Sequence, residues 1–236
     1  MAYREHAPPP ELAPWLECTW ERHSERGVPV RVLPDGCIDL VWTEGKGTQV
    51  VGANTTAFLV ALPGGVRIAG ARLRPGAAPS LLGVASEAVR DARVPVAELW
   101  AAGDAGYRLA AALDEQPDPV EGLRAELRGR AARAALPDPL VREAISRLAR
   151  PGVAIAPLAG ELGVSERQLR RRVSGAVGYG PKRLARVLRL LRALQAGRAG
   201  DDLARVALDA GYADQAHFAN DCRALAGVAP SVLLAE

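Results

Sequence analysis

The stretch IAPLAGELGVSERQLRRRV, residues 155–173, decides the fold of the C-terminal part of this chain. Apolar residues recur at helical spacing from Ile155 to Leu162, and a three-residue break, Gly163 to Ser165, follows them. Ser165 is a typical N-cap residue, so a second helix is expected to begin directly after it. The pattern predicts a helix-turn-helix, in which a glycine in the turn lets two helices meet at a steep angle.

The second helix of this unit separates an apolar face from a basic face. Leu169 is expected to pack on the first helix, whereas Arg167, Arg170 and Arg171 share the opposite side because they are three and four residues apart. Arg172 lies nearer the packed side, and we expect it to contact an acidic residue or the backbone. The unit therefore presents a row of arginines to its surroundings.

The same pattern recurs later in the chain. A turn at Gly211 to Ala213 follows a short apolar helix, and Asp214 is placed to cap a helix over residues 215–225. The two turn glycines, Gly163 and Gly211, are 48 residues apart. This spacing predicts two tandem helix-turn-helix units, at about residues 154–174 and 202–225.

A single helix is expected to join the two units, over about residues 181–196. Pro181 suits a first helical turn, and leucines at helical spacing alternate with arginines along the segment. Such a helix would bury its apolar stripe and hold the two units at a fixed separation.

Residues 140–236 resemble the DNA-binding domain of the AraC/XylS family of transcriptional regulators. The resemblance is carried by LAGELGVS (158–165), GYGP (178–181), ALDAGYADQAHF (207–218) and GVAP (227–230). It implies two helix-turn-helix units bridged by a helix, and double-stranded DNA as the partner. Two earlier segments, LPDGCIDL (33–40) and LRPGA (73–77), look like an uncharacterised sensor-like domain often found ahead of this DNA-binding domain.

The chain departs from the family pattern in its second unit. Members of the family commonly carry His-Phe-x-Arg-x-Phe, whereas this chain has HFANDC over residues 217–222. Asn220 in place of arginine removes a cation that could contact phosphate or guanine, and Cys222 in place of phenylalanine fills less of the core. We therefore expect the second unit to contribute less DNA affinity than the first.

The N-terminal part is expected to form a small antiparallel sheet followed by helices. Strands are predicted at residues 28–33, 37–42, 48–51, 56–62 and 66–73. Ser86 is predicted to cap a helix, and longer helices are expected near residues 96–113 and 119–135. The prolines between residues 136 and 139 suggest a boundary, with an α+β domain at 1–137 and an all-α domain at 138–236.

The charge distribution and the cysteine content narrow the classes of protein to which this chain can belong. Residues 1–137 carry a net charge of −2 and residues 138–236 carry +5, with ten basic residues and one acid between Gly163 and Ala199. Three widely spaced cysteines give neither a disulfide framework nor a zinc ribbon. With no apolar signal core and no membrane-spanning run, we expect a cytoplasmic, nucleoid-associated protein.

These observations predict a bacterial-type, sequence-specific transcriptional regulator that reads the major groove through two recognition helices. Arginine suits guanine, glutamine and asparagine suit adenine, and alanine can contact the thymine methyl group. The candidate base-reading residues are Arg167, Gln168, Arg170, Arg171, Gln215, Ala216, Ala219 and Asn220. The candidate phosphate contacts are Ser165, Lys182, Arg183 and His217. Ser165 could equally act only as a cap, Lys182 only as a surface residue, and His217 only in local packing.

The aromatic residues of the N-terminal part have two alternative roles. Trp15, Trp20, Trp42 and Phe58 could line an effector pocket, although large aromatic residues more often fill cores. A small-molecule effector, RNA polymerase and a second copy of the chain are further candidate partners, and either a monomer or a homodimer fits the sequence.

We expect no catalytic residues, no metal site and no cofactor. One alternative is an interaction module that has lost DNA binding. Another is an Ada-like alkyl acceptor for DNA repair, which needs a reactive thiolate that the surroundings of Cys18 and Cys37 do not favour.

Overall fold

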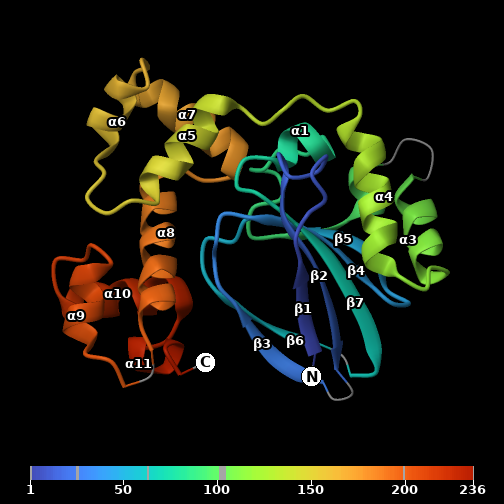
Figure 1. Ribbon diagram of the computed structural model, residues 1–236, viewed down its shortest axis with the longest axis horizontal. Helices are drawn as coiled ribbons and strands as arrows, with labels where there is room; N and C mark the ends of the chain where they lie inside the picture. Colours follow the sequence, from blue (N-terminus) through green and yellow to red (C-terminus); the bar gives the residue numbers. More distant parts are fainter. Residues whose placement is uncertain (1, 25–26, 63, 101–104, 199, 236) are drawn as a thin grey trace.

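The computed structural model describes residues 2–24, 27–62, 64–100, 105–198 and 200–235 of the chain, which has a sheet-rich N-terminal part and a helical C-terminal part (Figure 1). The strands are β1 (Ala2–His6), β2 (Leu16–Ser24), β3 (Val28–Val32), β4 (Ile38–Thr43), β5 (Gly47–Val51), β6 (Phe58–Leu62), β7 (Val66–Leu73) and β8 (Arg93–Pro95). The helices of the same part are α1 (Ala78–Leu82), α2 (Val96–Leu99), α3 (Ala105–Asp114) and α4 (Pro119–Ala131).

Two antiparallel sheets form in this part. One has six strands in the order β1-β2-β7-β4-β5-β8, and the other pairs β3 with β6. The predicted strands at residues 28–33, 37–42, 48–51, 56–62 and 66–73 correspond to β3 to β7. The sequence reasoning missed β1, β2 and β8, of which β1 and β8 are the edges of the six-stranded sheet.

The six-stranded sheet has two distinct faces, because successive residues of a strand point to opposite sides. Trp42 on β4 pairs with Ala69 on β7, and both side chains are fully buried in the core. Trp20 on β2 pairs with the next residue, Gly70, and therefore lies on the other face. A Cβ atom on Gly70 would come within 2.3 Å of the Trp20 ring, so glycine is needed there.

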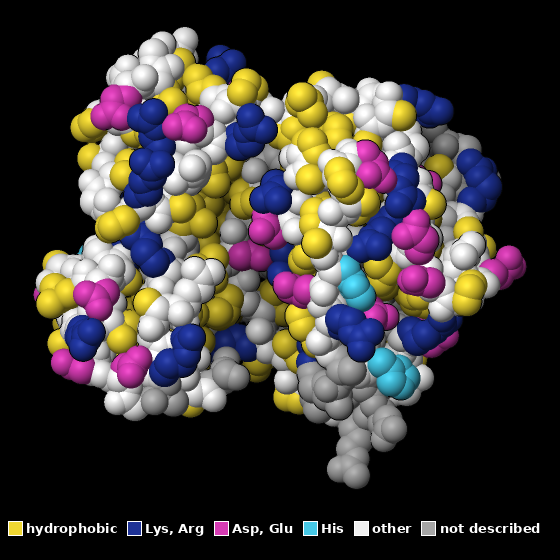
Figure 2. Space-filling model, in the orientation of Figure 1, with side chains coloured by type: hydrophobic (Ala, Val, Ile, Leu, Met, Phe, Trp, Pro, Cys, Tyr) yellow, Lys and Arg dark blue, Asp and Glu magenta, His cyan; other side chains and the backbone are white. Residues whose placement is uncertain are grey.

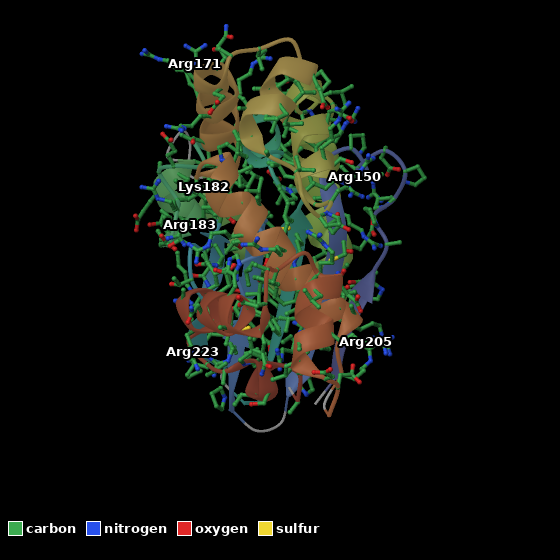
Figure 3. All side chains as sticks on the ribbon, turned by 90° about the vertical axis from the view of Figure 1, so that its left-hand side faces the viewer. Arg150, Arg171, Lys182, Arg183, Arg205 and Arg223 are labelled. Carbon is green, nitrogen blue, oxygen red and sulfur yellow. The ribbon has the colours of Figure 1, made fainter. Side chains whose placement is uncertain are left out.

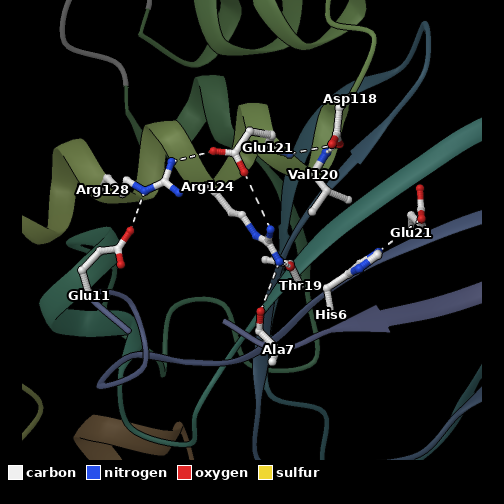
Figure 4. Close-up of polar contacts among 10 residues, drawn as sticks. All are labelled: His6, Ala7, Glu11, Thr19, Glu21, Asp118, Val120, Glu121, Arg124 and Arg128. Carbon is white, nitrogen blue, oxygen red and sulfur yellow. Dashed lines mark hydrogen bonds and ion pairs between the residues drawn. The ribbon is translucent and has the colours of Figure 1, made fainter. Parts of the chain in front are cut away.

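Helices α3 and α4 cover the core face of this sheet (Figure 1). The indole nitrogen of Trp42 donates a hydrogen bond to Asp114 of α3 at 3.0 Å. Arg124 of α4 donates to the buried hydroxyl of Thr19 on β2 at 2.8 Å, and Figure 4 shows the surrounding polar contacts. These hydrogen bonds tie the helices to the sheet in addition to the apolar packing between them.

The C-terminal part contains seven helices among the described residues. They are α5 (Pro139–Leu148), α6 (Ile155–Glu161), α7 (Glu166–Val177), α8 (Pro181–Ala196), α9 (Leu203–Asp209), α10 (Gln215–Ala226) and α11 (Pro230–Leu233). Helix α8 has the bounds expected for the bridging helix and runs between α5 to α7 at one end and α9 to α11 at the other (Figure 1). The α+β fold class is confirmed.

One hydrophobic core extends from the sheet into the first helix-turn-helix unit. The cluster that contains Trp42 also contains Leu169, Val173 and Val177 of α7 and Leu184 of α8. A second cluster lies around α9 and α10, and Leu33 and Ala57 of the N-terminal part pack against it. The two parts of the chain are therefore joined by side-chain packing as well as by the backbone.

Polar contacts reinforce the junction with the first unit. Ser86 is fully buried, and its hydroxyl donates a hydrogen bond of 2.6 Å to the carbonyl oxygen of Ala176 in α7. Arg90 donates to the carbonyl of Gly178 at 2.9 Å. The prediction that Ser86 caps a helix is wrong, because residues 86–91 form turns and the hydroxyl binds a distant helix end instead.

A second set of contacts joins the N-terminal part to α8 and α10. Arg31 donates to the carbonyl of Ala226 at 2.9 Å, and the backbone nitrogen of Ala57 donates to the carbonyl of Leu225 at 2.6 Å. Arg183 of α8 donates to the carbonyl of Thr55 at 2.7 Å. The first two contacts satisfy carbonyl groups in the last turn of α10, which an α-helix leaves without partners of its own.

Candidate nucleic-acid interface

The first helix-turn-helix unit consists of α6 and α7 and begins its second helix with a capping box. The Ser165 hydroxyl oxygen accepts from the Gln168 backbone nitrogen, and the Gln168 side chain accepts from the Ser165 backbone nitrogen at 2.8 Å. Both predicted residues therefore contribute to the helix start, and the Gln168 side chain is folded back toward the cap. The turn glycine, Gly163, has a φ of +68°, a conformation that favours glycine.

Helix α7 presents its basic face to the outside. The side chains of Arg167, Arg170 and Arg171 are exposed, while Leu169 is fully buried. Arg172 forms an ion pair of 3.4 Å with Asp138, as the sequence predicted for an acidic contact. Three arginines thus project from the recognition helix of the first unit without any described ion-pair partner.

The second unit consists of α9 and α10, and Asp214 caps α10 through the backbone nitrogen of His217. Gln215, Ala216 and Asn220 are exposed and Ala219 is half-buried, so the predicted base-reading residues lie at or near the surface. The interior holds Phe218 and Cys222, both fully buried. The smaller cysteine is therefore accommodated inside the core of this unit.

A buried carboxylate in α10 holds two arginines of α8. Asp221 has only 4% of its side chain exposed and lies 2.7 Å from Arg186 and 3.1 Å from Arg189. The ring nitrogen Nε2 of His217 lies 3.3 Å from Arg189, and the Arg189 guanidinium stacks 4.4 Å from the centre of the Tyr212 ring. This network fixes the second recognition helix to the bridging helix.

Helix α8 carries the remaining predicted phosphate contacts in different environments. Lys182 is exposed, whereas Arg183 is half-buried and bonds to the N-terminal part through Thr55. Figure 3 shows Arg171, Lys182, Arg183 and Arg223 along one side of the view, from the first unit to the second, with Arg150 and Arg205 on the other. Basic side chains therefore lie along the whole C-terminal part, and Figure 2 shows them from its top to its bottom on the left of the view.

A cleft of about 1030 Å³ separates the two units on the surface of α8. Residues of both recognition helices line it, including Arg170 of α7 and His217 of α10. The basic residues that line it are Arg150, Arg170, Lys182, Arg183, Arg186, Arg189 and Arg192, and the acidic ones are Glu166 and Asp221. Four of these residues are not among the predicted contacts, although the regular spacing of arginines along α8 is a signal in the sequence; they are Arg150, Arg186, Arg189 and Arg192.

The four candidate effector-pocket residues lie in two different environments. Trp15 and Trp42 are core residues, at 5% and 0% exposure, and neither lines the cavity that the other two line. Trp15 donates to the carbonyl of Ala135 at 3.3 Å, and Trp42 packs under the helices. Trp20 and Phe58 do line a cavity, of about 540 Å³, that lies between the six-stranded sheet and the β3-β6 pair.

This cavity has apolar walls and buried polar groups. Asp39 on β4 and Arg72 on β7 are paired across the two strands at 3.4 Å and line it, and burial raises the pKa of Asp39 to about 7 despite the neighbouring guanidinium. The indole nitrogen of Trp20 is buried without a hydrogen-bond partner among the described residues. Leu191 of α8 also lines the cavity, so the bridging helix contributes to its wall.

The cysteines do not have the surroundings of reactive thiolates. Burial raises the pKa of Cys18 to about 11, that of Cys222 to about 12, and that of Cys37 well above its usual value. Within the described ranges no group of three or more His, Cys, Asp or Glu residues could hold a metal ion. No helix among the same residues is long and apolar enough to cross a membrane.

Comparison with known families matches two regions of the chain. Residues 158–236, which include both units and α8, match a family described as a helix-turn-helix domain. The C-terminal part of the chain is an AraC-type helix-turn-helix domain. This match supports a DNA-binding role in transcription for the C-terminal part of the chain. Residues 4–95 match a domain of unknown function, as the LPDGCIDL and LRPGA segments suggested.

Solved structures of other regulators are similar to parts or all of the chain. The C-terminal domain of AraT, a response regulator from Geobacillus stearothermophilus, is 22% identical over 41% of this chain and 84% of that one, with a TM-score of 0.38. A probable AraC family transcriptional regulator from Rhodopseudomonas palustris is 28% identical over 40% and 90%, with a TM-score of 0.34. ToxT from Vibrio cholerae is 11% identical over 99% and 98%, with a TM-score of 0.46. No curated protein matches the chain.

Proposed function

We propose that the chain regulates transcription by binding a specific DNA sequence with α7 and α10 as its two recognition helices. The observation that carries this proposal is the arrangement of the AraC-type domain, in which α8 holds two helix-turn-helix units with exposed second helices. Two such helices can enter successive major-groove faces on one side of a duplex, about one helical turn apart. Because DNA is the partner, we place the protein at the nucleoid in the cytoplasm.

The first unit supplies most of the base reading. Arg167, Arg170 and Arg171 are exposed and unpaired within the described chain, so their guanidinium groups can grip guanine O6 and N7. Gln168 is the weakest candidate of this helix, because its side chain is engaged in the capping box. In the second unit, Gln215 suits adenine and Ala216 suits the thymine methyl group, while Asn220 and Ala219 give softer contacts.

The test is a selection of binding sites from random oligonucleotides with the full chain, followed by affinity measurements on the selected duplex. Replacing both Arg170 and Arg171 by alanine should lower affinity for the selected site by at least about 30-fold, since two bidentate contacts of about 1–3 kcal/mol each contribute about 2–6 kcal/mol together. Replacing the exposed Arg108 of α3 by alanine should leave it unchanged. Undiminished affinity in the double variant would refute the assignment, and the half-site spacing of the selected sequences would show whether a homodimer binds.

A second candidate function is control by a small molecule in the cavity between the two sheets. The cavity volume of about 540 Å³ suits a small ligand, and the buried indole nitrogen of Trp20 is a donor for which the described part of the chain supplies no acceptor. Because Leu191 of α8 lines the same cavity, a ligand there would contact the helix that spaces the two units.

Thermal-shift measurements with metabolites on the full chain and on Trp20→Phe would test this role. A ligand of the cavity should raise the melting temperature of the wild type and change its tryptophan fluorescence, and the shift should shrink in the variant. Equal shifts in both proteins would place the ligand elsewhere.

A further inference from the structure

The cleft between the two helix-turn-helix units contains a cation that the described part of the chain does not neutralise. Arg192 of α8 lines this cleft, and its Nε and Nη1 atoms are buried with no hydrogen-bond partner. No ion pair is formed by Arg192 with any described residue. Burial and the neighbouring Arg189 both lower its pKa, so the site works against the charge that it holds.

The neighbouring arginines of α8, unlike Arg192, have a carboxylate partner within the protein. Arg186 and Arg189 share the carboxylate of Asp221, at 2.7 Å and 3.1 Å, and so have a counterion within the protein. Arg192 lies on the same side of α8, one turn further along, and has no carboxylate partner among the described residues. A partly buried guanidinium is costly unless an anion compensates it, so the part of the Arg192 side chain that lines the cleft favours an anion there.

The composition of the cleft specifies the sign and kind of that anion. Seven basic residues and two acidic ones line it, which excludes a cationic ligand on electrostatic grounds. Guanidinium groups bind phosphate oxygens through paired hydrogen bonds, and phosphate is the anion that duplex DNA presents at regular intervals.

The position of the cleft specifies where the anion would come from. Its walls include Arg170 of α7 and His217 of α10, one residue from each recognition helix. A duplex that contacts both helices has to cross the space between them. The turn of the second unit lies against the segment between α5 and α6 at this point, since a Cβ atom on Gly211 would lie 3.0 Å from Pro151.

We propose that this cleft is a phosphate site that holds one backbone phosphate of duplex DNA between the two major-groove contacts, with Arg192 as its principal cation. This inference rests on the proposed DNA-binding function and adds a contact that sets the register of the protein without reading bases. Asp221 limits the strength of the site, because it neutralises the two arginines next to Arg192.

The test measures the salt dependence of binding to a mixed-sequence duplex by fluorescence anisotropy, for the wild type, Arg192→Met and Arg108→Met. Each phosphate contact contributes about 0.9 to the slope of log K against log salt. Arg192→Met should lose about that amount, so that its affinity falls about threefold less than that of the wild type between roughly 50 and 200 mM salt. Arg108→Met removes the same charge from α3 and should keep the wild-type slope.

Stability in the absence of DNA separates a binding role from a structural role. Removing an uncompensated cation should leave the melting temperature of Arg192→Met equal to or above that of the wild type. Asp221→Asn supplies an independent measurement, because it releases Arg186 and Arg189 and should steepen the salt slope. A lower melting temperature of Arg192→Met, or a slope that Asp221→Asn does not steepen, would overturn the proposal.

Inorganic phosphate distinguishes the two sources of the anion. If phosphate raises the melting temperature of the wild type above that in chloride of equal ionic strength, and Arg192→Met keeps the wild-type slope on DNA, the site binds a free anion and the DNA assignment is wrong. An unchanged slope with no phosphate effect also refutes the site but leaves DNA binding intact. A wild type that binds no duplex at all would refute the DNA-binding function and this inference together.

Discussion

Replacing Ser86 by alanine should weaken the whole molecule, because this serine joins the sheet-rich part to the end of the first recognition helix. Its hydroxyl is fully buried and donates to the Ala176 carbonyl at 2.6 Å. Alanine would leave that carbonyl without a donor at a site closed to water. The free energy of unfolding should therefore fall by about 1–3 kcal/mol. For a chain of this size, the melting temperature should fall by roughly 2–4 °C per kcal/mol.

Urea unfolding followed by two probes would test this prediction. All four tryptophans lie in the first 100 residues, so their fluorescence reports on the sheet-rich part, whereas far-UV circular dichroism is dominated by the helices. Because one core runs through both regions, the two transitions should coincide and shift together in Ser86→Ala. The exposed Ser231→Ala should change stability by less than about 0.5 kcal/mol. Separate transitions, or an unshifted fluorescence transition in Ser86→Ala, would refute a shared core.

Two further predictions follow from buried titratable groups. Burial raises the pKa of Asp39 to about 7, so between about pH 4 and 7 the folded state holds a proton that the unfolded state releases. The contribution of Asp39 to the free energy of unfolding should thus be largest below about pH 4 and fall by at most about 1.4 kcal/mol per pH unit as the pH rises to 7. The free energy of unfolding, measured by urea titration at each pH, should change less with pH in Asp39→Asn than in the wild type. If the two profiles are parallel, Asp39 does not titrate in this range. Because burial raises the pKa of Cys18 and Cys37, iodoacetamide should label them slowly at pH 7.5 in the native protein and rapidly in urea; rapid native labelling would revive a reactive-cysteine role.

Local sequence signals predicted the C-terminal part in detail because its helix ends are specified by caps. Ser165, Asp214 and Pro181 start α7, α10 and α8 where their chemistry requires. The predicted exposure of Arg170 and the acidic contact of Arg172 followed from helical spacing alone. These features depend on residues within one or two turns of each other, and sequence reasoning handles that range well.

The features that sequence reasoning missed depend on distant residues. Strands β1 and β2 each contain adjacent charged residues, as in Trp20-Glu21-Arg22, so no apolar run marked them. Nothing near Ser86 indicated that its partner would be Ala176, ninety residues later. Likewise, composition could not show that Trp42 faces the core while Trp20 faces the cavity, because that depends on the register of each with β7.

The shared core limits which N-terminal domains can replace residues 1–137 of this chain. A chimera that exchanges residues 1–137 for another N-terminal domain would remove the contacts of Ser86 and Arg90 with the end of α7 and expose the cluster around Val177. A transplant of the C-terminal part should therefore succeed only if the new N-terminal domain supplies its own equivalent of the 84–91 segment. In this chain the sensor-like part is also part of the scaffold that shapes the first recognition helix, so the two parts would have to change together during evolution.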